Sequence, residues 1–425
     1  MRTVSHSLNL FPLFMTLNLR FNPTNQGILK GTKNLPDIPP LTSHDFIEKE
    51  LSYDFCLQKT EQILRKNISS IPKKKFAIGL SGGTDSSINT ILLSQREDVS
   101  LKLFSIGFND QSDEFEDARI VAKLVNRDYK EIILDDIISD LPLMVWKFGS
   151  PKSNLWPYYS FKTVKNLGAD TTLSGEGGDE LFGGYYFRYL KYLQRIPKSP
   201  FKRAERYLYS RTRDWIPNQN KIFGAKFKKN GKSLYTSNDL ISYFSPTFNN
   251  KLSYMNQIFL ADFNFKLRFD FNFVDTVFAN KEKIKIYSPF LKPNIIKFAT
   301  HIPHKYKLSK NTSKMILRDI LKKNGAPKKI YEKQKQGWGM KPTTIWKGGL
   351  SDRCERFLLN GTLVRDGWIN KNWLRYAYEF IEKRKNSNPE ITFPYINKLW
   401  DMLSFEIFYL QRVLKESKGW TICSW

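Results

Sequence analysis

The feature that most constrains the fold is the alternation of short apolar segments with amphipathic ones across residues 76–173. The apolar segments predict strands at 76–80, 101–108, 129–134 and 171–173, and the amphipathic ones predict helices at 86–95 and 114–126. Strands that alternate with helices pair in parallel, because each helix carries the chain back across one face of the sheet. The sequence therefore predicts an α/β fold with a doubly wound parallel sheet, which binds ligands beyond the carboxyl ends of its strands.

The rest of the chain is predicted to be largely helical. A helix is expected at 46–67, and additional C-terminal helices are expected after residue 186, the last of them buried, at 389–415. Near the start, residues 8–19 are mildly apolar, but polar residues and Pro12 interrupt them and no small-residue cleavage site follows. We interpret this segment as strand-bearing and not as a signal peptide.

The net charge is strongly positive, because 68 Lys and Arg residues against 41 Asp and Glu residues leave +27. Such a balance attracts anions, among them nucleic acid, acidic lipid and nucleoside triphosphates. The basic residues are spread along the chain, so a solvated basic surface is the simplest interpretation. No apolar run reaches the ~18–20 residues that span a bilayer, so no membrane partner is expected. Three widely separated cysteines fit a reducing cytoplasm.

A glycine-rich loop, Ser-Gly-Gly-Thr-Asp-Ser, occupies residues 81–86 between the first expected strand and its helix. Its two glycines allow the backbone to approach a ligand, and the N-terminus of the following helix favours phosphate. Asp85 would repel phosphate unless a cation lay between them, and Mg²⁺ is the cation that combines carboxylate with phosphate oxygens. The loop therefore predicts a site for a nucleotide and Mg²⁺, with a plain strand–turn–helix junction as the alternative.

A second glycine-rich loop follows the last expected strand and gathers three carboxylates within residues 173–185. A purely structural turn has no need for Glu176, Asp179 and Glu180 together in so basic a protein. Asp179 can share a metal ion with Asp85, and Glu176 is placed to act as a base or to orient a nucleophile. A structural turn with solvated acids is the alternative interpretation.

Together the two loops resemble the synthetase domain of asparagine synthetase B, a member of the N-type ATP pyrophosphatases. Other strings resemble the same family in order and spacing, over roughly residues 50–410. They are Phe-Ser-Ile-Gly-Phe at 104–108, Ser-Pro-Phe-Leu at 288–291, Lys314 with Leu317 and Arg318, Lys-Gln-Lys-Gln-Gly-Trp at 333–338, and Leu399 with Trp400. The resemblance implies the ATP pyrophosphatase fold, which is similar to that of adenine nucleotide α-hydrolases.

The resemblance also implies a reaction. A carboxylate attacks the α-phosphate of ATP, pyrophosphate leaves, and ammonia or another amine displaces AMP to give an amide. By matching position, the resemblance assigns pyrophosphate binding to Ser81, Gly82, Gly83, Asp85 and Ser86, and adenosine binding to Leu80, Ile106, Ser174 and Gly175. It implies that Asp85 and Asp179 bind Mg²⁺, and that Lys335 stabilises the charge that develops between the α- and β-phosphates. It implies that Glu176 acts on the incoming amine or on the tetrahedral intermediate.

The start of the chain departs from the family pattern. Position 2 is Arg, where asparagine synthetases usually carry the cysteine nucleophile of a glutaminase domain. Residues 1–50 resemble only the tail of that domain and a linker, so the synthetase-like domain is expected at 51–425. Nitrogen is then expected from free ammonia, from a separate glutaminase subunit or from a different amine.

Further departures concern the expected substrate end. Tyr287 stands where the family has Arg, Lys292 where it has Asp, and Lys333 where it has the first Arg of its Arg-x-Lys string. Gly149 or Ser150 replaces an acidic residue. These changes leave the expected ATP site intact and put aspartate as the carboxylate in doubt.

Four hypotheses of function follow. The first is an asparagine synthetase that uses ammonia or a partner glutaminase. The second is an amide ligase for another carboxylate, of the β-lactam synthetase, peptide cyclase or amidotransferase type, which the changes at Lys292 and Gly149 favour. The third is chemistry on tRNA, which the basic charge favours and the second loop and the lack of Cys-x-x-Cys pairs disfavour. The fourth is a non-catalytic regulator, which the retention of the acids and of Lys335 disfavours.

Overall fold

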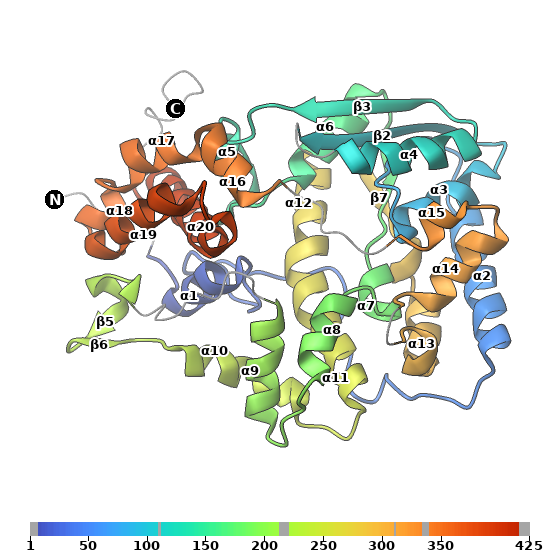
Figure 1. Ribbon diagram of the computed structural model, residues 1–425, viewed down its shortest axis with the longest axis horizontal. Coiled ribbons are helices and arrows are strands. Elements are labelled where there is room, and N and C mark those ends of the chain that lie inside the picture. Colours follow the sequence, from blue (N-terminus) through green and yellow to red (C-terminus); the bar gives the residue numbers. More distant parts are fainter. Residues whose placement is uncertain (1–6, 109–111, 212–220, 310–311, 334–339, 416–425) are drawn as a thin grey trace.

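The structure is a computed structural model that describes residues 7–108, 112–211, 221–309, 312–333 and 340–415. Its central sheet has five parallel strands in the order β3-β2-β1-β4-β7 (Figure 1). The strands are β1 (Lys75–Gly79), β2 (Ser100–Phe108), β3 (Tyr129–Leu134), β4 (Thr171–Leu173) and β7 (Lys285–Tyr287). From the central β1 the chain adds strands first on one side and then, with β4, on the other. The predicted doubly wound parallel sheet is confirmed, and its switch point lies between β1 and β4.

The central strand is buried on both faces. Phe76 and Ile78 pack into the hydrophobic core on one side of the sheet, whereas Ala77 packs into the core on the other. Side chains alternate across a strand, so a continuous apolar run is what a strand between two helical layers requires. This is why the short apolar segments in the sequence locate β1 to β4 well.

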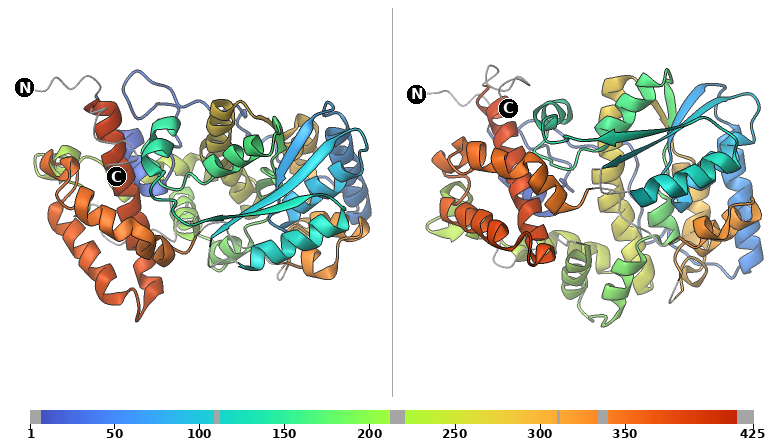
Figure 2. Two further views of the ribbon diagram at one scale, coloured as in Figure 1. Left: turned by 90° about the horizontal axis from the view of Figure 1, so that it is seen from above. Right: turned by 45° about the horizontal axis from the view of Figure 1, so that its top comes forward.

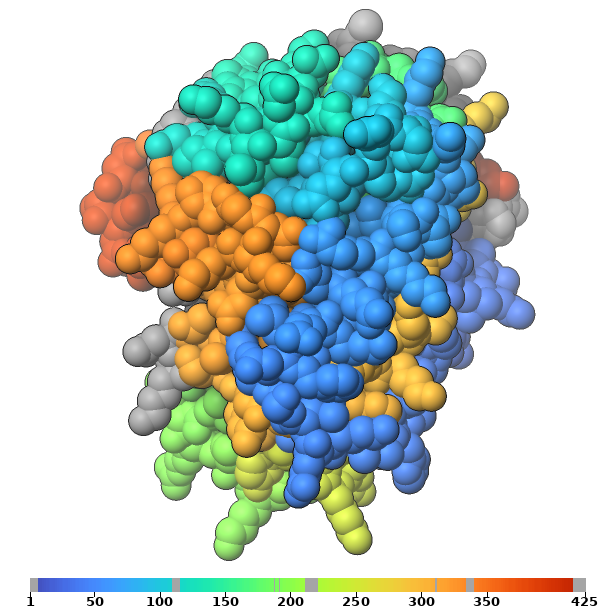
Figure 3. Space-filling view, turned by 90° about the vertical axis from the view of Figure 1, so that its right-hand side faces the viewer, coloured from blue at the N-terminus to red at the C-terminus, as the bar shows by residue number. Residues whose placement is uncertain are grey.

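Helices cover both faces of the sheet, as the three ribbon views show (Figures 1 and 2). On one face lie α2 (Tyr53–Ser69), α3 (Thr84–Ser94), α4 (Ser112–Leu124) and α14 (Met315–Lys323). On the other lie α6 (Pro157–Asn166) and α12 (Asn272–Glu282). Figure 3 shows the first layer from outside, with the blue segment of α2 beside the orange segment that contains α14.

Beyond this sheet the described residues are mostly helical, and the predicted additional C-terminal helices are confirmed. Between β3 and β7 lie α5 (Leu141–Phe148), α7 (Gly178–Phe182), α8 (Tyr186–Leu193), α9 (Pro200–Arg211), α10 (Ser237–Phe244), α11 (Tyr254–Ala261) and the small hairpin β5–β6 (228–229, 232–233). After β7 come α13 (Pro293–His301), α15 (Lys328–Tyr331), α16 (Pro342–Ile345), α17 (Ser351–Arg353), α18 (Thr362–Arg365), α19 (Lys371–Arg384) and the buried α20 (Phe393–Phe408).

The expectation of a strand near the start is wrong, because Leu10–Leu19 form the helix α1. Pro12 lies in the first turn, where its missing N–H costs no intrahelical bond. The side chain of Asn18 donates to the Phe14 carbonyl (2.7 Å), so the polar residue is satisfied within the helix. The helix packs in one core with α20, which is contributed from the far end of the sequence.

The helix expected at 46–67 begins later than predicted, at Tyr53, because Ser52 caps its first turn with a hydrogen bond from the Phe55 N–H (3.2 Å). The proposed division of the chain at residues 50 and 51 stays a prediction, and residues on both sides of it share a core. In the described part of the chain, no helix is both long and apolar enough to cross a membrane.

Candidate active site

A cavity of about 600 Å³ opens at the carboxyl ends of β1 and β4, where the order of the strands reverses. Both glycine-rich loops contribute to its wall. The predicted site residues that line it are Ser81, Gly83, Asp85, Ser86, Ser174, Gly175, Glu176 and Asp179. The amide of Asn89 on α3 donates to the Ser174 carbonyl (2.9 Å) and so joins the first loop's helix to the second loop.

The remaining predicted site residues lie elsewhere. The side chains of Leu80 and Ile106 are buried in the hydrophobic cores on opposite faces of the sheet, and the described cavity wall is formed beside them by Gly79 and Phe104. Gly82 lies behind the wall, against α4. Lys335 lies outside the described residues.

The first loop is held by its own serines. The Ser81 and Ser86 hydroxyls are 3.1 Å apart, the Gly83 N–H donates to Ser81 Oγ (3.3 Å), and Ser86 Oγ donates to the Gly83 carbonyl (3.2 Å). Gly82 has a φ of +65°, and a Cβ there would lie 2.4 Å from the Cβ of Asp117. Only glycine therefore allows the chain to turn at this point and to present the N-terminus of α3 to the cavity.

The second loop packs directly on Asp85. A Cβ on Gly178 would lie 2.3 Å from Asp85 Oδ1, and one on Gly184 would lie 1.8 Å from Asp179 Oδ1. Contacts this short leave no room for a side chain at either position. The glycines of the second loop therefore bring two carboxylates from different loops to the same place.

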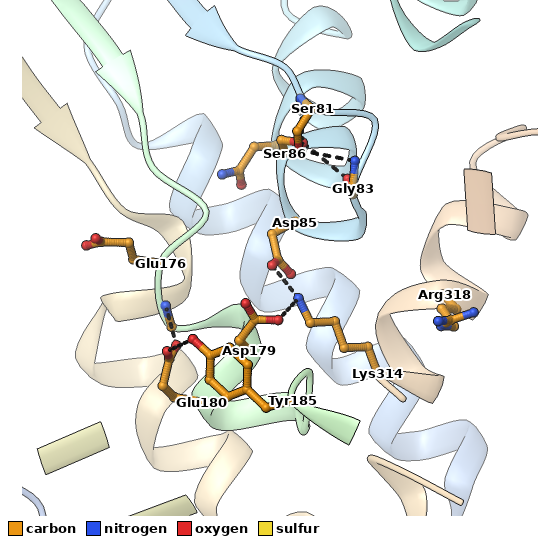
Figure 4. A network of polar contacts seen from close by, with 12 residues as sticks. Ser81, Gly83, Asp85, Ser86, Glu176, Asp179, Glu180, Tyr185, Lys314 and Arg318 are labelled. Atoms are coloured by element: carbon orange, nitrogen blue, oxygen red, sulfur yellow. Dashed lines mark hydrogen bonds and ion pairs between the residues drawn. The ribbon is translucent and has the colours of Figure 1, made fainter. Parts of the chain in front are cut away.

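The ammonium of Lys314 lies between these two carboxylates (Figure 4). Its Nζ is 2.5 Å from Asp179 Oδ1 and forms a second ion pair with Asp85 Oδ2. Lys314 is only 3% exposed, so this is a charge cluster inside the protein and not a surface ion pair. Two carboxylates that share one cation position beside a helix N-terminus also suit Mg²⁺, which takes one or two carboxylates together with phosphate oxygens.

Two more cations line the cavity. Lys333 Nζ is 2.6 Å from Asp117 Oδ2 and donates to the Ser81 carbonyl (3.4 Å). The guanidinium of Arg318 donates to the carbonyls of Tyr331 (3.0 Å) and Lys333 (2.9 Å). Arg318 thereby fixes the backbone that leads towards Lys335.

A second acid pair lies on the other side of the second loop. Glu176 points away from the Lys314 cluster (Figure 4), and its Oε2 accepts a hydrogen bond from Asn272 Nδ2 on α12 (3.1 Å). Burial, followed by the neighbouring Asp275 carboxylate, raises the pKa of Glu176 well above its usual range. Burial also raises the pKa of Asp275 to about 7. The pair therefore retains a proton at a pH where isolated carboxyls have lost theirs.

Glu180 stabilises the second loop through hydrogen bonds within it. Its carboxylate accepts hydrogen bonds from the Gly177 N–H (3.2 Å) and the Tyr185 hydroxyl (2.6 Å). Burial and then the charge of Asp179 raise the pKa of Glu180 to about 7. This capping arrangement fixes the turn that places Asp179 in the cavity.

Sequence reasoning assigned no role to Lys314, Lys333, Arg318 or Asp275, and all four line the cavity. Lys314, Arg318 and Lys333 belong to strings that resemble the family, so the sequence did contain a signal for them. Asp275 lies on α12 in a stretch with no recognised motif, and only the return of that helix to the sheet places it beside Glu176. The buried Lys152 was also missed; it lines the cavity and pairs with Asp270 (2.6 Å).

The parallel sheet, with a glycine-rich loop and paired carboxylates at its switch point, defines a doubly wound α/β protein with a candidate ligand site at that point. The sequence model of the family described as Asparagine synthase matches residues 72–409. The chain belongs to this family.

Three curated relatives show the range of the likeness. The chain is 27% identical over 377 residues to asparagine synthetase [glutamine-hydrolyzing] 1 of Bacillus subtilis, covering 80% of this chain and 56% of the relative. It is 29% identical to the putative asparagine synthetase [glutamine-hydrolyzing] 2 of Methanocaldococcus jannaschii, over 45% of this chain and 38% of that one. It is 35% identical to the NH3-dependent NAD(+) synthetase of Sulfurisphaera tokodaii, over 24% of this chain and 38% of that one. The chain thus spans little more than half of these relatives at most.

Proposed function

We propose that this protein activates a carboxylate with ATP, releases pyrophosphate, and transfers the acyl group from the acyl-adenylate to ammonia or another amine. The observation that carries the proposal is the division of one cavity between a charged end, Asp85 with Asp179 and Lys314, and a proton-holding end, Glu176 with Asp275. The first suits a triphosphate, and the second suits an amine that must lose a proton.

At the charged end, the N-terminus of α3 and the cations Lys314 and Lys333 would bind the phosphates. Asp85 and Asp179 would hold Mg²⁺, which when bound supplies the positive charge that offsets the pyrophosphate leaving group. As the carboxylate oxygen of the substrate forms its bond to the α-phosphorus, the bond to pyrophosphate breaks. We assign Lys335 to the charge that develops there.

At the proton-holding end, the amine nitrogen would attack the acyl carbon, and the bond from that carbon to AMP would break. The attacking nitrogen must lose a proton, and the Glu176–Asp275 pair, which lines the same cavity, would receive it. A carboxylate pair with a raised pKa is a stronger base near neutral pH than a solvated carboxylate. Before the reaction the pair is only partly protonated, so it can still accept a proton.

Aspartate is our first choice of carboxylate, because asparagine synthetases are the principal relatives. Ammonia is our first choice of amine, and the partial likeness to an NH3-dependent synthetase supports it. Supply by a separate glutaminase subunit and a cytoplasmic location stay predictions. So does the absence of nucleic acid and membrane partners.

A second candidate, an amide ligase for another carboxylate, is favoured by the wall just beyond residue 150. There the buried ammonium of Lys152 pairs with Asp270 and donates to the Arg20 carbonyl (2.8 Å). The family's acidic residue is replaced nearby by Gly149 or Ser150. This stretch therefore lacks the usual acid and carries a buried Lys–Asp ion pair close by, which would alter recognition of the charged groups of aspartate.

The test is exchange of labelled pyrophosphate into ATP with Mg²⁺ and each of a panel of carboxylic acids, followed by AMP and amide formation on adding ammonia. Exchange with aspartate supports the first choice, and exchange only with another acid supports the second candidate. Lys335→Ala should abolish exchange while leaving the protein folded. Exchange with no acid in the panel, or exchange that survives Lys335→Ala, would contradict this assignment of the site.

A further inference from the structure

The position between Asp85 and Asp179 is already taken by a cation that belongs to the chain. Lys314 Nζ contacts both carboxylates, and its side chain is 4% exposed. The carboxylates come from separate loops, and one ammonium contacts an oxygen of each. Breaking an ion pair inside a protein by removing one partner is costly, because it takes a compensating charge away from the other partner.

The second loop packs closely around the lysine and Asp85. A Cβ at Gly184 would lie 2.5 Å from Lys314 Cε, and the Cβ that Gly178 lacks would press on Asp85. The backbone of Lys314 is also constrained. It caps α14 with a φ of +54°, a left-handed conformation, and its carbonyl accepts from the Arg318 N–H (2.9 Å). The lysine therefore enters the cluster from a fixed point on the helix.

Mg²⁺ and the lysine ammonium would compete for the same oxygens. A metal ion that arrived alone would have to break the ion pairs of Lys314 with Asp85 and Asp179, and breaking ion pairs inside a protein is costly. A triphosphate changes this balance. Its oxygens can accept the ammonium while the two carboxylates accept the metal, so neither cation is left uncompensated.

We propose that Lys314 is the resident counter-ion of the metal site, which blocks free Mg²⁺ and admits it only together with ATP. The proposal rests on the proposed function in one respect, namely that Asp85 and Asp179 hold the metal. It assigns to Lys314 an ordering role. In the nucleotide-free protein the lysine ammonium contacts both carboxylates, and it moves to the phosphates when metal and nucleotide bind together.

The experiment measures binding of Mn²⁺, a spectroscopic substitute for Mg²⁺, to the full chain without nucleotide, by electron paramagnetic resonance. Lys314→Met should bind Mn²⁺ about tenfold or more tightly than the wild type, because the competing charge is gone. Lys314→Arg keeps the charge and should stay near the wild type. Lys329→Met is the matched control, since Lys329 pairs with Glu116 (2.5 Å) and lies outside the cavity wall. Equal Mn²⁺ affinities of wild type and Lys314→Met would overturn the proposal.

Thermal unfolding without nucleotide is the second measurement, because Lys314→Met removes the ammonium that contacts both carboxylates and should lower stability. Mn²⁺ should raise the Tm of this variant and leave that of the wild type nearly unchanged. An equal rise in both proteins would overturn the proposal. Tight Mn²⁺ binding by Lys314→Met, combined with no binding of Mg–ATP by the wild type, would support the counter-ion and contradict the proposed function, so the two failures can be told apart.

Discussion

Two pairs of carboxylates line one cavity, and they differ in what lies beside them. Asp85 and Asp179 are bridged by the ammonium of Lys314. Glu176, by contrast, receives a hydrogen bond from an amide, that of Asn272, and faces a second acid, Asp275. The same kind of side chain is therefore kept in an ion pair in one half of the site and kept partly protonated in the other.

This difference shows that environment, more than residue type, divides the chemistry. A carboxylate bridged by a cation stays ionised and can exchange that cation for a metal ion. A buried acid beside another acid shares a proton and can accept one from a substrate. Only a few residues of the second loop separate the two halves, and Figure 4 shows Glu176 and Asp179 pointing to opposite sides of it.

Removing charge from the bridged pair should have the largest effect. Asp85→Asn should lower pyrophosphate exchange by about 10²–10³-fold, because the metal and its phosphate oxygens lose a ligand. Asp54→Asn is the matched control, since Asp54 also lies in the first turn of a helix, α2, and is exposed. Exchange at the wild-type rate in Asp85→Asn would show that this pair does not hold the metal.

Altering the proton-holding pair should separate the two half-reactions. Glu176→Gln keeps the shape of the side chain and an oxygen for the Asn272 hydrogen bond, but it cannot take a proton. Amide formation should fall by about 10²–10⁴-fold, while pyrophosphate exchange stays within about threefold of the wild type. Both rates are measured on the same preparation. An equal fall in both would place Glu176 in the activation step.

The difference between the two pairs was only partly visible in the sequence. The strands β1 to β4 and the two loops were predictable because their signals are local: an apolar run, two glycines, an acid. The edge strand β7, which has only three residues, was not predicted. Lys314 and Asp275 could not be paired with their partners, since each comes from a distant helix that only the topology returns to the sheet. The helix α1 was missed for a similar reason, because its burial depends on α20.

The close approach of the two loops should matter less than the charges themselves. Gly178→Ala places a methyl group against Asp85 and should weaken Mg–ATP binding by about tenfold, as Asp85 is pushed from the position it shares with Asp179. Gly348→Ala is the control, because a Cβ there has no heavy atom within 4 Å and its φ is −78°. Equal affinities in the two variants, measured by calorimetry, would show that the loops have room to separate.

The smallest effect concerns the pH dependence of stability. Burial raises the pKa of Asp275 to about 7 from a usual value of 3.8, so the folded protein holds this proton more tightly than the unfolded chain. The stabilisation that comes from this proton is fully present below the usual pKa of 3.8, and it is lost as the pH rises through the folded-state pKa of about 7. Asp275→Asn removes that loss. In urea unfolding, the free energy of unfolding of the variant minus that of the wild type should be roughly 1–2 kcal/mol larger at pH 8 than at pH 5. The figure is this small because part of the shift is shared with Glu176. A difference between variant and wild type that is the same at both pH values would show that the acid pair holds no extra proton.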